Sequence, residues 1–255
     1  MGKIYTFWSP LHGQCKTTST AIAVAMAEAK KGIDTVITHV QPRLSFMEKY
    51  LGFDEQQNVL KDVGLNYLIY NEVARELNEK DIKQAVIKIC EHLYMLPAIE
   101  QAQCNAEKDL LISNLVVNEL PKYYRRVIID LGTETYRGNL RGSDRELIKT
   151  ITDAAATNFV VLSQSTWLWE KYETPNSAYI ISGYDPMSRN TKFNFKFKTG
   201  ESAITIPLCT AFSDALSSGE VPLFYERNEN LNIKKPQENI SLFLKQTSEV
   251  IKNND

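Results

Sequence analysis

The sequence has few of the residues that build metal clusters, redox pairs and disulfide frameworks. It contains 255 residues but only 3 histidines and 4 cysteines. The cysteines are far apart, at Cys15, Cys90, Cys104 and Cys209, and no two of them form a CxxC pair. This spacing excludes a zinc-ribbon or thioredoxin-type motif, and isolated thiols are typical of a reducing compartment.

Long apolar runs and an excess of one charge are missing as well. No stretch approaches about 18 consecutive apolar residues, so we expect no integral membrane segment, and residues 1–13 show no signal-peptide pattern. The net charge is -2, which leaves nucleic-acid binding only to a local basic patch. With 43% hydrophobic residues, the chain can form a large core. We expect a cytoplasmic protein with a single domain over residues 1–255.

Strand-like and helix-like segments alternate along the chain. Strands are predicted at 4–8, 34–40, 93–98, 125–130, 158–165, 178–184, 193–198 and 203–207. Helices are predicted at 16–32, over most of 44–89 with a break near Gly64, and at 109–120, 146–155, 211–218 and 238–252. This alternation predicts an α/β fold with one doubly wound, mostly parallel sheet flanked by helices.

The clearest functional signal is the loop HGQCKTTS at residues 12–19, between the first strand and the first helix. Such a loop points backbone N–H groups at phosphate oxygens, beside the positive end of the helix. Lys16 is predicted to neutralise the β- and γ-phosphates. Thr17 is the predicted Mg²⁺ ligand, and the Thr18 hydroxyl is placed within reach of the α-phosphate.

Two positions depart from the usual P-loop pattern GxxxxGK[ST]. Cys15 stands directly before Lys16, and Leu11 occupies the place of the first glycine. An alternative interpretation therefore stays open, in which Thr residues cap an ordinary helix N-terminus and Lys16 extends into solvent.

A carboxylate in the expected place favours the phosphate interpretation. Asp130 ends the predicted buried strand 125–130, where a P-loop enzyme needs an acid to hold the magnesium shell. Gly132 follows, and its N–H is expected to approach a γ-phosphate. The alternative for Asp130 is a turn residue at the end of a strand.

With these segments in this order, the chain resembles the MinD/ParA family of P-loop ATPases, which carry a deviant Walker A motif. The family reads K-G-G-x-G-K-T-T after its first strand, and the corresponding residues are Leu11, His12, Gly13, Gln14, Cys15, Lys16, Thr17 and Thr18. VIIDLG at 127–132 resembles the Walker B strand. The segment 203–224 resembles the late region whose loop contacts adenine. LYMLPA at 93–98 is similar to CpaE- and TadZ-like members of pilus and secretion systems.

The resemblance implies an ATPase fold that binds ATP with Mg²⁺, forms a homodimer and captures a protein partner in a pilus, secretion or conjugation system. It implies cofactor contacts from residues 11–18, Gly132 and Pro207. The implied metal ligands are Thr17 and Asp130, and the implied catalytic residues are Lys16, Gln41 and Asp130.

Two further departures bear on turnover. The family's signature lysine, which reaches across the dimer, is replaced by Leu11. The family's D-x-D is His39-Val40-Gln41, and Gln41 can orient water but cannot act as a carboxylate base. We therefore predict that nucleotide binding is kept better than hydrolysis, which is slow or absent.

Three alternatives stay open. In the first, the chain is a degenerate scaffold that binds no nucleotide. In the second, it is a DNA-partition ATPase whose basic patch is formed by residues 188–200 and Lys234–Lys235. The duller interpretation of 188–200 is a strand with Phe inward and Lys in water. A third alternative is a nucleophilic Cys15, whose thiol pKa a helix N-terminus would lower.

Overall fold

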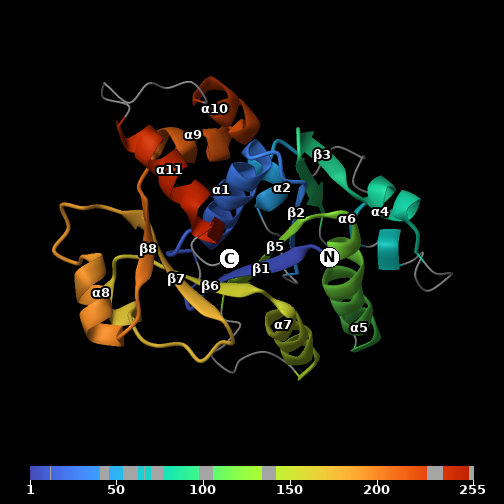
Figure 1. The fold of residues 1–255 in the computed structure, drawn as a ribbon, viewed down its shortest axis with the longest axis horizontal. Coiled ribbons are helices and arrows are strands. Elements are labelled where there is room, and N and C mark those ends of the chain that lie inside the picture. Colours follow the sequence, from blue (N-terminus) through green and yellow to red (C-terminus); the bar gives the residue numbers. More distant parts are fainter. Residues whose placement is uncertain are drawn as a thin grey trace.

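The computed structural model describes residues 1–11, 13–40, 46–53, 63–65, 67–69, 77–97, 106–133, 142–228 and 238–252. An eight-stranded sheet runs through the middle of the molecule, in the order β3-β4-β2-β5-β1-β6-β7-β8 (Figure 1). The strands are β1 Lys3–Ser9, β2 Thr35–His39, β3 Ile87–Cys90, β4 Leu93–Leu96, β5 Arg126–Thr133, β6 Thr157–Leu162, β7 Ser177–Tyr184 and β8 Ala203–Pro207.

Neighbouring strands are parallel except for β3 and β4, which form an antiparallel pair at one edge. The predicted α/β fold with one mostly parallel sheet is therefore confirmed. The carboxyl ends of the parallel strands meet along one edge, which is where such sheets bind ligands.

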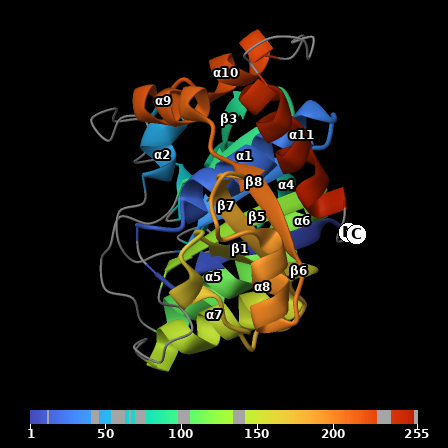
Figure 2. The same ribbon diagram turned by 90° about the vertical axis from the view of Figure 1, so that its left-hand side faces the viewer.

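Helices cover both faces of this sheet. They are α1 Thr17–Lys30, α2 Met47–Tyr50, α4 Glu79–Ala85, α5 Ala106–Asn114, α6 Leu120–Tyr123, α7 Gly142–Ala154, α8 Lys192–Thr199, α9 Thr210–Ser218, α10 Val221–Asn228 and α11 Glu238–Lys252, with a π-helix η2 Leu115–Glu119 and a 3-10 turn η3 Thr166–Leu168. Helices α1, α9 and α11 lie on one face, and α5 and α7 lie on the other (Figures 1 and 2). None of the helices in the described ranges is long and apolar enough to cross a bilayer.

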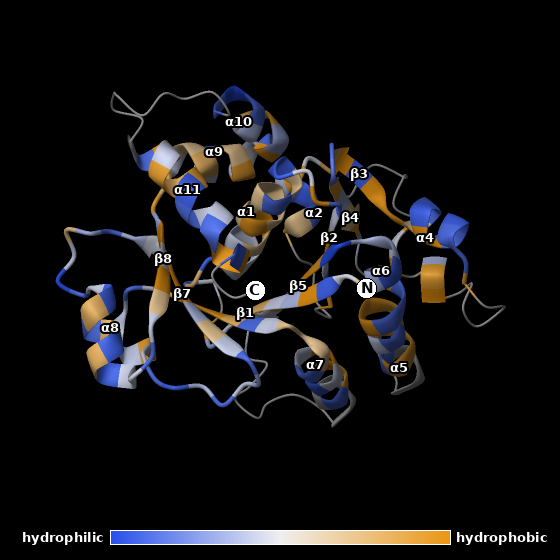
Figure 3. Cartoon of the chain, in the orientation of Figure 1, coloured by the Kyte–Doolittle hydropathy of each residue, from blue (hydrophilic) through white to orange (hydrophobic). Residues whose placement is uncertain are grey.

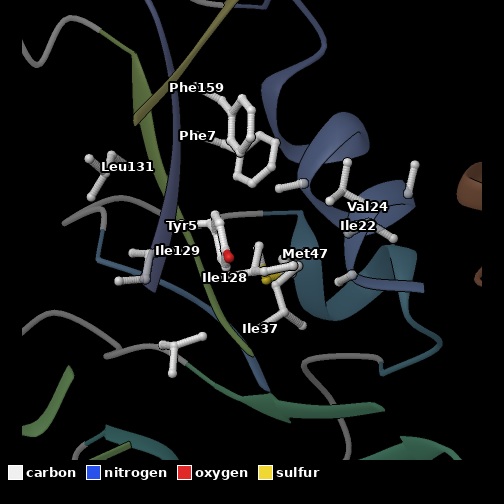
Figure 4. Close-up of a cluster of buried hydrophobic side chains, with 14 of the residues drawn as sticks. Tyr5, Phe7, Ile22, Val24, Ile37, Met47, Ile128, Ile129, Leu131 and Phe159 are labelled. Carbon is white, nitrogen blue, oxygen red and sulfur yellow. The ribbon is translucent and has the colours of Figure 1, made fainter. Parts of the chain in front are cut away.

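The core lies between the sheet and these helices. Phe7 of β1 and Phe159 of β6 stack with their ring centroids 4.8 Å apart, next to buried Ile and Val side chains from α1, β2 and β5 (Figure 4). The small alanines of α1 allow this helix to lie close to the strands, so its first turn sits firmly at the ends of β1 and β5. Figure 3 shows hydrophobic residues along β5 and β8 and hydrophilic residues on the outer helices α4 and α10.

One predicted strand is wrong. Residues 193–198 belong to α8, which begins with a capping box between Thr191 and Asn194 and ends at Gly200 in the left-handed conformation. The aromatic alternation does not place all three phenylalanines on one face. Phe195 is buried against Trp169 and Tyr179, at centroid distances of 5.6 and 5.3 Å, whereas Phe193 and Phe197 are exposed.

Three smaller differences concern helices and an edge strand. The predicted helix at 109–120 is divided into α5, η2 and α6, because a π-helical turn interrupts it. Strand β3 lies at the end of the segment predicted as mostly helical, and α10 was not predicted at all.

Candidate functional site

The predicted phosphate loop connects β1 to α1 at the carboxyl edge of the sheet. The Ser9 hydroxyl donates a 3.0 Å hydrogen bond to the Leu11 carbonyl, which fixes the start of the loop. The Leu11 side chain is half-buried and packs against the core. Gly13 has φ 73, and both Gly13 and Gln14 are exposed. The loop therefore presents its tip to solvent. His12 and Gln41 lie outside the described residues.

Lys16 stands at the N-cap of α1 in the left-handed conformation, with φ 57 and ψ 39. This conformation costs a non-glycine residue about 1 kcal/mol, and such backbone strain gathers at functional sites. Its carbonyl accepts hydrogen bonds from the Thr20 N–H at 2.9 Å and the Thr20 hydroxyl at 2.8 Å. The side chain extends to the end of β7, where its Nζ lies 3.5 Å from the position that a Cβ on Gly183 would take.

A cavity of about 190 Å³ opens beside Lys16. Pro207 at the end of β8 lines it too, so two of the predicted cofactor-binding residues face one space. Ser182 and Gly183 also line the cavity, and the Ser182 and Thr20 hydroxyls lie 2.9 Å apart. Neither of these two β7 residues was predicted from the sequence. The available signal was their place at the end of a predicted parallel strand, since these ends meet at one edge.

Asp130 is fully buried near the end of β5 and accepts two hydrogen bonds. The Thr18 hydroxyl donates to its Oδ2 at 2.5 Å, and the Gly132 N–H donates to its Oδ1 at 2.8 Å. Burial raises the pKa of Asp130 above its ordinary value, while these two hydrogen bonds oppose that rise. The loop, the helix and β5 are thus joined through one carboxylate.

A register shift in β5 positions the Gly132 N–H for its hydrogen bond to Asp130. Phe7 of β1 faces Asp130, but the next residue of β1, Trp8, faces Gly132, so Leu131 is an extra residue. Such a bulge bends the strand locally. Gly132 has φ 73, a conformation that residues with a Cβ rarely adopt, and its N–H returns to the carboxylate two residues earlier.

A histidine–glutamate pair lies next to Asp130. His39 of β2 is the register partner of Asp130, and its Nε2 lies 3.0 Å from Oε1 of Glu48 on α2. His39 lowers the pKa of Asp130 and Glu48 raises it, so both groups act on the same carboxylate. The His39 Nδ1 is buried and has no hydrogen-bond partner within the described part of the chain. Neither a role for His39 at this edge nor the presence of Glu48 was predicted from the sequence.

The Cys15 side chain points away from the tip of the loop. Its thiol is buried, and it interacts with the Ser163 backbone, the Ser9 hydroxyl and the Leu11 backbone. Burial raises the pKa of this thiol and outweighs these interactions. A buried thiol with a raised pKa does not favour the alternative of a nucleophilic Cys15. The cysteine replaces a glycine by placing its side chain beneath the loop.

The oxygen donors around Asp130 suit Mg²⁺, which prefers carboxylates and hydroxyls. A buried carboxylate with a raised pKa also gains strongly from a nearby cation. The residues present therefore fit this metal. The prediction gave the metal-side hydroxyl to Thr17, whereas the hydroxyl bonded to Asp130 belongs to Thr18, and Thr17 is buried.

Comparisons with solved structures identify the fold. A ParA family ATPase from Chlorobium tepidum superposes with a TM-score of 0.73 and 15% identity, over 98% of both chains. MinD complexed with Mg-ADP from Pyrococcus horikoshii gives 0.66 and 15%, over 99% of this chain and 97% of that one. A putative plasmid partition protein from Borrelia burgdorferi bound to AMPPNP gives 0.65 and 14%, over 100% of both. No protein-family model and no curated protein matches the sequence. The chain thus has the P-loop fold of ParA and MinD ATPases.

Proposed function

We propose that the chain is one nucleotide-binding domain over residues 1–255, which binds ATP with Mg²⁺ at the carboxyl edge of its sheet. One observation carries the proposal. Lys16 at the head of α1 shares a cavity with Pro207, and the first turn of the same helix is bonded to the buried Asp130 through Thr18.

Each residue has a distinct role in this proposal. The Lys16 ammonium neutralises phosphate oxygens, and the backbone N–H groups of loop residues 11–15 surround them. Asp130 and a threonine hydroxyl, Thr18 or Thr17, hold the magnesium shell. Bound Mg²⁺ supplies positive charge that neutralises the phosphates. The cavity beside Pro207 receives the base.

In this proposal ATP binding shifts the dimerisation and partner-binding equilibrium, and energy from ATP hydrolysis contributes little. Gln41 orients water without acting as a base, and Leu11 lacks the charge of the lysine that crosses the dimer in relatives, so hydrolysis is slow or absent. ATP favours a homodimer that captures a partner in the cytoplasm. The three cysteines that the structure describes are free thiols, which supports a reducing compartment. The assembly served is a pilus, secretion or conjugation system, as the CpaE- and TadZ-like central segment suggests.

Equilibrium binding of ATP and ADP, with and without Mg²⁺, tests this function. We expect micromolar, magnesium-dependent binding that Lys16→Ala abolishes. Lys245→Ala, which removes an exposed lysine on α11, is the matched control and should bind as the wild type does.

Two outcomes would replace the proposal. No binding at millimolar nucleotide would make the chain a scaffold that works through protein contacts alone. ATP-dependent, salt-sensitive binding to duplex DNA, lost when Lys234 and Lys235 are changed to Glu, would make it a DNA-partition ATPase.

A further inference from the structure

Helix α8 presents two phenylalanines to solvent. Phe193 is 74% exposed and Phe197 is 95% exposed. They lie one turn apart on the same side of the helix, about 160° around its axis from the buried Phe195. We call Phe193 and Phe197 the α8 crest. Isolated exposed apolar residues are ordinary, but two large rings side by side indicate a surface that something covers.

The α8 crest does not contribute to the contacts that define and anchor α8. The Thr191–Asn194 capping box and the left-handed Gly200 define both ends of α8, and Phe195 fixes it to Trp169. The exposed rings therefore stand on a rigid, preformed support. Substitution of Phe193 or Phe197 should leave the fold intact, so their role can be tested separately from stability.

Positive charge surrounds the crest. Residues 186–200 contain Arg189, Lys192, Lys196 and Lys198 and no acidic residue, in a chain whose net charge is -2. Lys192 and Lys196 lie on one flank of the crest, and the Lys192 Nζ is 5.8 Å from the centroid of the Phe193 ring.

The acidic groups nearest in the sequence lie beyond the two ends of this segment. Glu201 is paired with Lys171 at 2.9 Å, and the Asp185 carboxylate accepts a hydrogen bond from the Met187 N–H. The positive charge of α8 is therefore not neutralised by its own stretch of chain.

Two more exposed apolar residues lie in segments next to α8, in η3 and in the connection that precedes α8. On the other flank, the Lys198 Nζ donates a 2.5 Å hydrogen bond to the Thr166 carbonyl of η3, where Trp167 is 59% exposed. Met187, in the connection that precedes α8, is 90% exposed. Figure 1 shows α8 at the outer end of the molecule, beyond β8.

From this arrangement we propose that α8 docks on the surface of a bilayer that contains anionic lipids. Aromatic rings partition into the boundary between headgroups and acyl chains, and flanking lysines attract anionic headgroups. Both needs are met by one exposed helix face, and a bilayer is deformable, so it can receive these side chains without a preformed groove. Single-stranded nucleic acid, which stacks bases on aromatics, and a protein groove are the competing occupants.

Vesicle flotation with the full chain tests the proposal. We expect binding to vesicles made of equal parts phosphatidylglycerol and phosphatidylcholine, weaker binding at high salt, and little binding to pure phosphatidylcholine. Phe193→Ser with Phe197→Ser should lower the partition coefficient at least about tenfold, and Lys192→Glu with Lys196→Glu should do the same. Leu110→Ser, which removes an exposed apolar residue on α5, is the matched control and should change nothing.

The outcomes separate the occupants. Loss of flotation in both double variants, with unchanged thermal unfolding and unchanged ATP binding, supports the proposal. It is overturned if the wild type ignores anionic vesicles, if Leu110→Ser weakens binding equally, or if a labelled single-stranded oligonucleotide binds through the crest while vesicles do not. ATP binding is measured on the same samples, so failure of the proposed nucleotide function is seen independently.

Discussion

The Thr18 hydroxyl donates a hydrogen bond to Oδ2 of Asp130 at 2.5 Å, and this contact joins the first turn of α1 to the end of β5. The contact places the Thr18 hydroxyl beside the carboxylate that we propose for the magnesium shell. Thr17, the predicted metal ligand, is its buried neighbour on α1.

Thr18→Val removes this hydrogen bond and leaves a buried carboxylate oxygen without its donor. We expect the free energy of unfolding to fall by about 1–3 kcal/mol, and the Mg²⁺ dependence of ATP binding to weaken. Chemical denaturation and calorimetric titration measure the two effects. If Thr17→Val abolishes the magnesium dependence while Thr18→Val retains it, the metal-side hydroxyl belongs to Thr17.

Asp130→Asn should stabilise the nucleotide-free protein at neutral pH. The folded-state pKa of Asp130 lies above its ordinary value of 3.8 because of burial, so the folded state holds a proton that the unfolded state has released. Stability therefore falls as pH rises from about 4 through the raised pKa. The Asn side-chain oxygen can still accept a hydrogen bond from the Gly132 N–H. Because the amide does not titrate, the pH-dependent loss of stability disappears. Thermal unfolding from pH 4 to 8 should show a flatter curve for Asp130→Asn than for the wild type, together with lost Mg²⁺ dependence of ATP binding. Equal slopes would contradict the buried, proton-holding carboxylate.

Cys15 should react slowly with iodoacetamide in the native protein. Its thiol is buried and its pKa is raised, so little thiolate forms at pH 8. The pKa of Cys90 is raised as well, but this residue is partly exposed and should be alkylated first. Peptide mass spectrometry over time measures both rates. Faster labelling of Cys15 would restore the nucleophile hypothesis.

Gln41→Asp should raise ATP turnover about tenfold or more, because a carboxylate can accept a proton from the attacking water. Steady-state phosphate release measures the rate, and ATP affinity is measured alongside it as the control. Unchanged turnover in a variant that still binds ATP would remove Gln41 as the reason for slow hydrolysis.

Two phenylalanines of α8 should respond differently to truncation. Phe195→Ala removes a buried ring between Trp169 and Tyr179 and should cost about 3–5 kcal/mol of unfolding free energy. Phe197→Ala should change it by no more than about 0.5 kcal/mol. Urea denaturation distinguishes this helix from the strand that the sequence suggested, in which the two rings share a face and are buried alike.

The sheet and the site edge could be predicted because their signals are local and consistent. An apolar strand, a turn-rich loop and an alanine-rich helix placed Lys16 at a helix N-terminus, and an apolar run placed Asp130 at a strand end. These positions meet because the carboxyl ends of parallel strands lie along one edge.

The errors have physical causes. At 193–198 the aromatic alternation fits a half-buried strand, but the Thr191–Asn194 box and Gly200 were the stronger local signals, and two rings remain in solvent. The His39–Glu48 contact joins β2 to a helix beyond it, and no spacing rule gives such a contact. The choice between Thr18 and Thr17 as the metal ligand stays a prediction for both, because sequence locates the start of a helix only within one or two residues.

The Gly132 N–H can donate one strong hydrogen bond, and in this structure it donates to Asp130. A phosphate oxygen that accepts this hydrogen bond must displace the carboxylate as the acceptor. Asp130 is then short of one donor in a dry environment, where a cation is the natural replacement. In the proposed nucleotide complex, a phosphate bound at Gly132 would therefore strengthen the affinity of Asp130 for Mg²⁺.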